Sequence, residues 1–486
     1  MTDDKNNNKD VIWTSAEAVA ATGGHATHDF AATGVSIDTR TLQKGQAFLA
    51  LKGDKLDGHD YVEAAFKAGA SVAIVSKDFK PKDPAWPLLQ VNDTMQALEA
   101  LGKASRDRTK AVIIGVTGSA GKTGTKEMVA VMLQANGKTH ASKKSFNNHW
   151  GVPLSLSNLP KDARFAVFEM GMNHKGEMTA LTKQVRPQIV IITTIEPAHI
   201  EHFKTLEAIA DAKAEIFTGM DAKGIVILNF DNPHFTRLKN SAEKAGLKKI
   251  YGFGEDEGAQ SRLVDCTLHA DSSRVTADIL GERVKYKLNI PGKHIVNNSL
   301  GALTVVKVAA GELAKAVEAL KNSEPVEGRG NRILVPLEAD KPPLTIIDES
   351  YNANPASMLA AFKVFELVQP VPGGRRIAIL GDMLELGKDG PRLHAELANP
   401  LLKAKTELLY CCGPQMDALY QALPPDWRGA HADDSKALIP KLLEIVKPGD
   451  VLLIKGSAGS KMGYIIHALQ GLQPSQQKSR DQRNAV

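Results

Sequence analysis

Apolar runs that end in glycine or polar residues recur along most of the chain. In the middle third they cover residues 111–116, 165–171, 188–195 and 224–229, and segments with helical spacing of apolar residues lie between them. Short apolar runs bounded by turn residues are typical of buried strands, and strands that alternate with helices indicate a mostly parallel sheet with helices on both faces. We therefore predict a doubly wound α/β domain over residues 109–325.

Two further α/β units flank this domain in the sequence. In residues 1–108, the short apolar runs QAFLAL and ASVAIVS surround a helical segment, YVEAAFKAGA. In residues 326–486, the runs LTIIDES, RIAILGDM, ELLYCCG and DVLLIKGSAGS start a second series of strands, which predicts a Rossmann-like domain. Alternating short stretches over residues 245–290 predict an antiparallel insertion or sheet edge, and the polar tail from residue 473 onward is expected to be disordered.

The strongest candidate for chemistry is AVIIGVTGSAGKTG, residues 111–124. A strand, a glycine-rich loop and a helix in this order form a phosphate-binding cradle of backbone N–H groups. In such a loop Lys122 would reach the outer phosphates and Thr123 would contact Mg²⁺. The strict P-loop pattern has glycine where Val116 stands, so the loop is a shortened variant. The alternative is a glycine-rich turn that matches by chance, but the flanking strand and helix favour nucleotide binding.

Polar residues also follow the other central strands. Glu169, His199 and Asn229 should lie at the same sheet edge as the phosphate loop, where such sheets bind ligands. A carboxylate at the end of a buried strand needs a partner, and Mg²⁺ suits Glu169 better than the alternative of a Lys or Arg. For His199, metal binding and a plain loop position remain equally open from spacing alone.

Two other central residues are ambiguous. Lys213 lies on a predicted helix, and the sequence alone favours a solvated side chain. Asn297 and Asn298 lie near the start of another helix, where asparagine either caps the helix or contacts a purine base. In the C-terminal unit, the segment DESYNANP (348–355) is too polar for a core and too specific for a linker.

Two polar clusters in the N-terminal unit follow predicted strands. They are SIDTR, which contains Asp38, Thr39 and Arg40, and LKGDKLDGHDY, which contains Asp57, Gly58 and His59. Ligands bind at strand ends in such sheets, but Asp-Gly is also an ordinary turn dipeptide. Ligand binding and turn formation both remain open here.

Composition and charge indicate where the protein works and which partners it lacks, but they say little about its activity. The net charge of +5 comes from dispersed residues, so no basic block indicates nucleic acid. Three cysteines, Cys266, Cys411 and Cys412, form neither a disulfide framework nor a metal-binding pattern. The polar start of the chain is not a signal peptide, and no apolar run has the roughly 20 residues of a membrane helix. We expect a cytoplasmic monomer that neither inserts into membranes nor binds nucleic acid.

Taken together, several segments resemble the Mur ligases, the ATP-dependent amide-forming enzymes of peptidoglycan precursor synthesis. The matching segments are VTGSAGKT, NNHWGVPLSL, FEMGMN, PAHIEHF followed by DAKAEIF, the helix start with His294 and Asn298, DESYNANPASM and LGDMLELG. The resemblance extends from Ser36 to about Lys461. The last two segments imply that D-alanyl-D-alanine is joined to a UDP-N-acetylmuramoyl-tripeptide, rather than that an earlier stem-peptide residue is added.

The resemblance also implies roles for individual residues. Catalysis would rest on Lys122, Lys213 and His199, with Lys213 carried as a carbamate. ATP would be bound by Gly118, Ser119, Ala120, Gly121, Lys122, Thr123, Asn298, Arg329 and Asp348. Thr123 and Glu169 would hold one Mg²⁺, and His199 would help to hold a second. Substrates would contact Asp38, Thr39, Arg40, Asp57, Gly58, His59, Asn147, Asn148, Asn352 and Asn354.

The chain departs from the family pattern at four positions: Gly124, Ile295, Glu349 and Ala458. The implied reaction forms an acyl phosphate from ATP, which an amine then attacks, and the sequence does not assign the base for that amine. The alternatives are another Mur-type amino-acid ligase, a ligase like folylpolyglutamate synthase, which lacks a UDP-binding front domain, and a P-loop GTPase switch. The GTPase should carry an NKxD motif, and the sequence has none.

Overall fold

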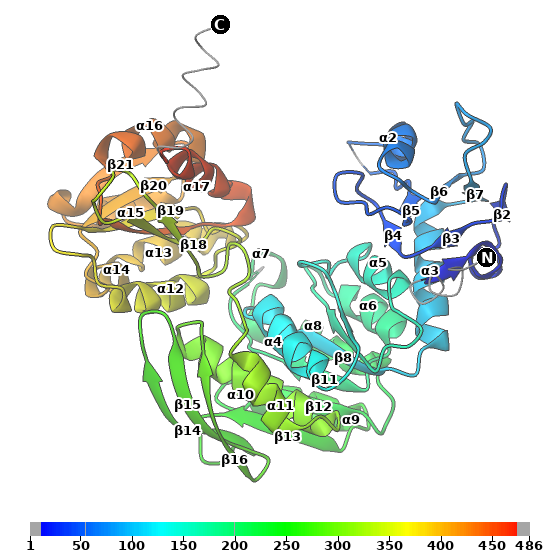
Figure 1. The fold of residues 1–486 in the computed structure, drawn as a ribbon. Coiled ribbons are helices and arrows are strands. Elements are labelled where there is room, and N and C mark those ends of the chain that lie inside the picture. Colours follow the sequence, from blue (N-terminus) through cyan, green and yellow to red (C-terminus); the bar gives the residue numbers. More distant parts are fainter. Residues whose placement is uncertain (1–10, 54, 199, 474–486) are drawn as a thin grey trace, which may run out of the picture.

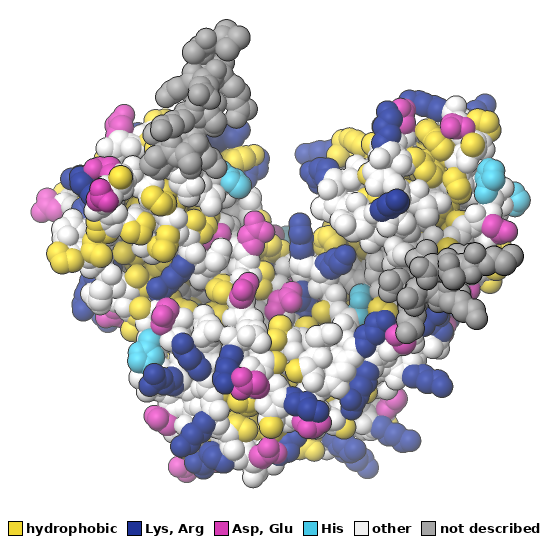
Figure 2. Space-filling view, viewed as in Figure 1, with side chains coloured by type: hydrophobic (Ala, Val, Ile, Leu, Met, Phe, Trp, Pro, Cys, Tyr) yellow, Lys and Arg dark blue, Asp and Glu magenta, His cyan; other side chains and the backbone are white. Residues whose placement is uncertain are grey.

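The computed structural model describes residues 11–53, 55–198 and 200–473, which form three larger sheets with their covering helices and a two-stranded sheet of β1 (Trp13–Thr14) and β3 (Ala31–Ala32). In Figure 1 the N-terminal unit (blue) and the C-terminal unit (yellow to red) stand on opposite sides of a central unit. The space-filling view shows that the molecule is hollowed between these two flanking units (Figure 2). The three-domain α/β prediction is confirmed, whereas the boundaries at 108 and 325 stay predictions.

The central sheet has nine strands in the order β16-β15-β14-β13-β12-β11-β8-β10-β9. The strand that leads into the glycine-rich loop is β8 (Val112–Thr117), which pairs in parallel with β10 (Phe165–Glu169) and β11 (Ile189–Ile192). The remaining strands are β9 (Thr139–Ala141), β12 (Ile225–Asn229), β13 (Lys249–Gly254), β14 (Ser261–Leu268), β15 (Ser273–Ile279) and β16 (Glu282–Leu288). Strands β14 to β16 are antiparallel, as residues 245–290 predicted.

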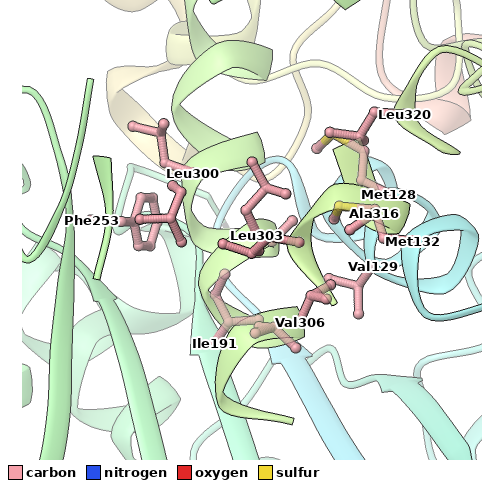
Figure 3. Packing of buried hydrophobic residues seen from close by; sticks show 14 of the residues in the cluster. Met128, Val129, Met132, Ile191, Phe253, Leu300, Leu303, Val306, Ala316 and Leu320 are labelled. Atoms are coloured by element: carbon pink, nitrogen blue, oxygen red, sulfur yellow. The ribbon is translucent and has the colours of Figure 1, made fainter. Parts of the chain in front are cut away.

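Helices cover both faces of this sheet. One face carries α4 (Lys122–Gln134), α10 (Lys293–Val308) and α11 (Leu313–Leu320), whose apolar side chains meet in the cluster of Figure 3. The other face carries α5 (Gly151–Ser157), α6 (Glu177–Val185), α8 (Leu206–Ala214) and α9 (Phe235–Lys244). The parallel strands β8, β10, β11 and β12 are buried on both faces, which explains why their sequences are continuously apolar. The antiparallel strands β14 to β16 instead alternate between buried and more exposed residues.

The C-terminal sheet has the order β17-β18-β22-β19-β20-β21 and is parallel except for β17. Its strands are β17 (Asn331–Val335), β18 (Leu344–Glu349), β19 (Arg376–Gly381), β20 (Leu408–Cys412), β21 (Arg428–Ala432) and β22 (Val451–Lys455). Helices α12 (Pro355–Leu367) to α15 (Met416–Ala422) cover one face, and α16 (Ser435–Ile445) with α17 (Gly463–Gln470) covers the other.

The N-terminal sheet has the order β2-β7-β6-β5-β4. Its strands are β2 (His25–Ala26), β4 (Val35–Ser36), β5 (Ala47–Leu49), β6 (Val72–Ser76) and β7 (Leu88–Val91). The long helix α3 (Thr94–Arg108) then leads into β8 of the central sheet. Among the described residues, no helix combines the length and apolar character needed to cross a membrane. The predicted disordered tail lies outside the described residues except for Gln473.

Candidate active site

The glycine-rich loop connects the end of β8 to the start of α4. Gly118 and Gly121 have φ angles of 150° and 77°, which favour glycine. A Cβ on Gly118 would lie 1.9 Å from Thr193 Oγ1, and one on Gly121 would lie 2.4 Å from Asn298 Nδ2. Both glycines are therefore required by close packing against β11 and α10, and the loop leaves its amides at the start of a helix, where anions bind.

Lys122 folds back over this loop. Its Nζ donates a hydrogen bond to the carbonyl oxygen of Gly118 over 2.8 Å. Burial lowers the pKa of Lys122, nearby Glu169 opposes that shift, and Arg329 adds to it. The ammonium is thus held beside the loop by a single backbone carbonyl, in a position to neutralise an anion bound there.

Glu169 and Thr123 offer oxygen atoms next to the loop. The carboxylate of Glu169 is fully buried, with 0% exposure; Oε1 accepts a hydrogen bond from Asn147 Nδ2 over 2.7 Å, while Oε2 has no partner among the described residues. The buried Thr123 hydroxyl lies 3.1 Å from Ser145 Oγ. An unpartnered buried carboxylate oxygen is unfavourable by itself, so the residues present fit a hard cation such as Mg²⁺.

The metal donors from the protein are few. Within the described ranges, no three His, Cys, Asp or Glu side chains gather closely enough to hold a metal on their own. Mg²⁺ commonly takes one or two carboxylates together with water and substrate phosphates, which matches this donor set. His199, predicted as a second metal ligand, lies outside the described residues.

Lys213 is buried, so the prediction of a solvated side chain is wrong. It is 2% exposed in α8, and among the described residues no carboxylate lies within ion-pair distance of its ammonium. Burial, with a smaller contribution from the charge of Lys122, lowers the pKa of Lys213 well below its usual value. The sequence alone could not predict the burial of Lys213, because that burial depends on how α8 packs against one face of the central sheet.

One cavity of about 390 Å³ joins the central and C-terminal units. Of the predicted site residues, Ser119, Ala120, Gly121, Lys122, Asn298, Arg329, Asn352 and Asn354 line it. Asn297, which the sequence left open between a helix cap and a base contact, also lines the cavity. Residues that were not predicted as a site line it as well, including Thr193, Thr194, Glu196, His294, Glu349 and Lys455. These lie at strand ends or at the start of α10, so their position after an apolar run was the signal that could have found them.

Arg329 and Asp348 occupy the connection between the two units. The guanidinium of Arg329 lies 4.1 Å from the ring centre of Tyr351, and its Nη2 donates to Ser145 Oγ over 3.4 Å. The carboxylate of Asp348 accepts hydrogen bonds from the amides of Gly328 and Ser350, over 3.2 and 3.0 Å. Asp348 therefore shapes the turn that presents Arg329 to the cavity.

Several predicted asparagines have structural contacts. Asn148 Oδ1 accepts from the amide of Gly151 over 2.9 Å at the start of α5. Asn354 caps α12 by accepting a hydrogen bond from the amide of Ser357 over 2.8 Å. Lys455 donates to the carbonyl oxygen of Asn352 over 3.0 Å and to Glu349 over 3.2 Å.

The N-terminal clusters do not line the cavity. Arg40 pairs with Asp38 over 2.7 Å beside half-buried Thr39. This pair, with a smaller contribution from Lys144 of the central unit, lowers the pKa of Asp38. In the second cluster, His59 Nε2 accepts from the amide of Ser76, so its Nδ1–H donates to Asp57 over 2.6 Å.

Gly58 completes that second cluster. A Cβ on Gly58 would lie 2.7 Å from the backbone nitrogen of Leu51, so only glycine fits there. The structure therefore separates the predicted site into a cavity near the phosphate loop and a second group of polar residues in the N-terminal unit.

Comparisons with known proteins agree across the three units. Family models match the Mur ligase family catalytic domain at residues 31–108, the Mur ligase middle domain at 116–306, and the Mur ligase glutamate ligase domain at 336–458. A UDP-N-acetylmuramoyl-tripeptide–D-alanyl-D-alanine ligase of Rickettsia prowazekii is 31% identical, covering 95% of this chain and 100% of the relative. The relative of the same name from Escherichia coli is 33% identical, and the match covers 91% of this chain and 94% of the relative.

A solved structure is also similar. A MurF crystal structure from Acinetobacter baumannii has a TM-score of 0.79 and 28% identity, covering 94% of this chain and 98% of that one. The agreement of sequence, fold and phosphate loop over nearly the full length leads to one conclusion: the chain belongs to the Mur ligase family.

Proposed function

We propose that the chain is an ATP-dependent ligase that joins D-alanyl-D-alanine to a UDP-N-acetylmuramoyl-tripeptide, forming ADP and phosphate, in cytoplasmic peptidoglycan precursor synthesis. The observation that carries the proposal is the cavity in which the phosphate loop faces the strand ends of the C-terminal unit. The relatives of Rickettsia prowazekii and Escherichia coli, named for this reaction, match more than nine-tenths of the chain.

The first step transfers the terminal phosphoryl group. The tripeptide carboxylate attacks the γ-phosphorus of ATP, the bond to the β-γ bridging oxygen breaks, and ADP leaves, so an acyl phosphate forms. Both reactants are anions, and bringing them together requires fixed positive charge and N–H donors. The loop amides and the Lys122 ammonium supply these, and Asn298 and Arg329 line the same cavity for the rest of the nucleotide.

The second step forms the amide. The amine of D-alanyl-D-alanine attacks the acyl carbon, a tetrahedral intermediate forms, and its collapse releases inorganic phosphate, while the amine gives up a proton. The Lys122 ammonium can stabilise the charge on the leaving phosphate from its place beside the loop. The polar clusters around Asp38 and Asp57 would hold the UDP end of the other substrate.

The proposed site includes one Mg²⁺ ion that side chains of this protein would bind. Thr123 Oγ1 and the unpartnered Oε2 of Glu169 would hold the ion, while Asn147 orients that carboxylate through Oε1. When bound, the ion neutralises phosphate charge. His199 stays a prediction for a second ion.

Lys213 would carry a carbamate. Its Nζ would attack CO₂, forming an N–C bond and releasing a proton, and this requires the neutral amine. Burial of Lys213 favours that neutral form. The family resemblance suggested the carbamate, and it stays a prediction.

The test is phosphate release from ATP with the two substrates supplied together and separately. We expect release to need both UDP-N-acetylmuramoyl-tripeptide and D-alanyl-D-alanine, because the acyl phosphate is consumed only when the amine is present. The Lys122→Ala variant is the matched control for contaminating ATPase. Release that needs a different amino acid, or a folate and glutamate, would instead identify one of the alternative ligases.

A further inference from the structure

Lys126 is a buried charged residue that the proposed chemistry does not use. It lies on α4, one turn after Lys122, and is 0% exposed. Its Nζ donates to the carbonyl oxygens of Ser142 and Lys144, over 2.6 and 2.8 Å. Its third neighbour is the Glu127 carboxylate, at 2.7 Å. Two hydrogen bonds and one ion pair therefore compensate the burial of this cation.

The two carbonyl groups belong to a connecting segment that contacts Thr123 at the start of α4. This segment, residues 142–148, runs from β9 to α5 and is called the 142–148 segment below. Its Ser145 hydroxyl contacts Thr123 over 3.1 Å and accepts from Arg329 over 3.4 Å. Its Asn147 donates to Glu169 Oε1 over 2.7 Å. Both candidate Mg²⁺ donors are thus oriented by side chains of one short segment.

The segment needs outside support to keep this shape. Lys144 has a φ angle of 49°, a left-handed conformation that is unfavourable for a residue with a side chain. The carbonyl of that same residue accepts a hydrogen bond from Lys126. Helix α4 starts at the loop itself, so Lys126 connects the segment to the element that carries Lys122 and Thr123.

We propose that Lys126 is a positioning residue for the Mg²⁺ site, acting through the 142–148 segment. The inference rests on the proposed function for the identity of the ion. Lys126 touches neither Thr123 nor Glu169; it holds the backbone from which Ser145 and Asn147 reach them. Partners one step removed from a metal commonly change metal affinity by about 10–100-fold when they are replaced.

The test compares ADP binding by calorimetry in excess EDTA and in Mg²⁺ for the Lys126→Met variant. We expect Mg²⁺ to strengthen ADP binding by the parent protein, and this gain to fall roughly tenfold in the variant, while affinity in EDTA changes by less than about twofold. Lys138→Met removes an exposed ion pair with Asp162 instead, so it should leave both affinities unchanged. Amide exchange of the 142–148 segment should be faster in Lys126→Met alone.

Equal loss of ADP affinity with and without Mg²⁺ would overturn the proposal, since general loosening of the loop predicts that result. So would no loss in either condition. If Lys126→Met does not fold, Lys126→Arg, which keeps a cation that can reach the carbonyls, should retain more of the Mg²⁺ gain than Lys126→Gln.

A multiple-mutant comparison tests whether Lys126 acts through Ser145 and Asn147. The Ser145→Ala/Asn147→Ala variant should have a reduced Mg²⁺ gain, and adding Lys126→Met should then have little further effect, because both contacts of the 142–148 segment with Thr123 and Glu169 are already removed. Additive losses would contradict action through Asn147 and Ser145. None of these measurements uses the tripeptide or D-alanyl-D-alanine, so they can fail or succeed independently of the proposed ligation.

Discussion

The central unit contacts its two neighbours in different ways. Toward the N-terminal unit, α3 packs on α5 so closely that a Cβ on Gly102 would lie 3.1 Å from the Pro153 carbonyl oxygen. Leu154 of α5 belongs to the apolar core of the N-terminal unit. Trp13 Nε1 donates to the Ser157 carbonyl over 2.8 Å, and the Asn158 side chain bonds both backbone groups of Val35.

Toward the C-terminal unit, the contacts are mostly polar, and one of them involves Arg329, which lines the cavity. The guanidinium of Arg329 reaches Ser145, and the guanidinium of Arg332 reaches the carbonyl of Ala270. The amide of Glu201 donates to the carbonyl of Glu385 over 3.2 Å, and Ile200 adds a small apolar contact. The first junction resembles a domain core, and the second resembles a binding site. We therefore expect substitutions at the first to change stability, and substitutions at the second to change turnover.

The largest expected effect is at the cavity. Lys122→Ala should reduce phosphate release in the presence of both substrates by about 10³-fold or more, because it removes the fixed cation beside the transferred phosphoryl group. Its melting temperature should stay close to that of the parent. A folded variant with near-normal turnover would show that the phosphates bind elsewhere.

Lys213→Ala tests whether activity depends on a carbamate at this residue. If Lys213 carries the proposed carbamate, we expect turnover to fall by roughly 10²-fold and to recover in part when formate or acetate is added, because a short acid would supply the missing carboxylate in the space left by the side chain. Addition of the same acids to the parent protein is the control. Full activity of the variant without added acid would contradict the carbamate.

Leu154→Ala tests the other junction. Its side chain is 5% exposed, so the substitution should lower the free energy of unfolding by about 2 kcal/mol through lost burial and a residual cavity. Denaturant unfolding measures that change, while kcat at low temperature should remain near the parent value. A large fall in kcat without a loss of stability would contradict the expectation that this junction contributes to stability and not to turnover.

The smallest expected effect concerns pH and His140, which lies in β9 just before the 142–148 segment. Burial lowers its pKa from 6.5 to about 4, and its ring donates to the Ser155 carbonyl. The unfolded chain thus binds a proton that the folded chain excludes between these values, so stability falls as the pH drops from about 6.5 toward 4. His140→Gln should flatten this part of the stability profile measured by denaturant. An unchanged slope would assign the pH dependence to other groups.

Local sequence pattern predicted much of the fold, and it placed the phosphate loop at the centre of the candidate site. The loop from Gly118 to Thr123 and the strand that ends on Glu169 were accessible because both depend on neighbours in the sequence. Burial of Lys213 and the occupied carboxylate of Asp348 depend on tertiary packing, which periodicity does not report. Asn148 and Asn354 were ambiguous for a chemical reason, since a side-chain amide that could contact a substrate can also bond backbone N–H groups at the start of a helix. Asn354 caps α12, and Asn148 accepts from the Gly151 amide at the start of α5.

The most direct measurement of the central claim is a crystal structure with a non-hydrolysable ATP analogue and Mg²⁺. We predict that the triphosphate lies against residues 118–123, with its outer phosphates near Lys122 Nζ and the ion between Thr123 Oγ1 and Glu169 Oε2. A triphosphate bound away from this loop, or an ion that touches neither residue, would contradict the account.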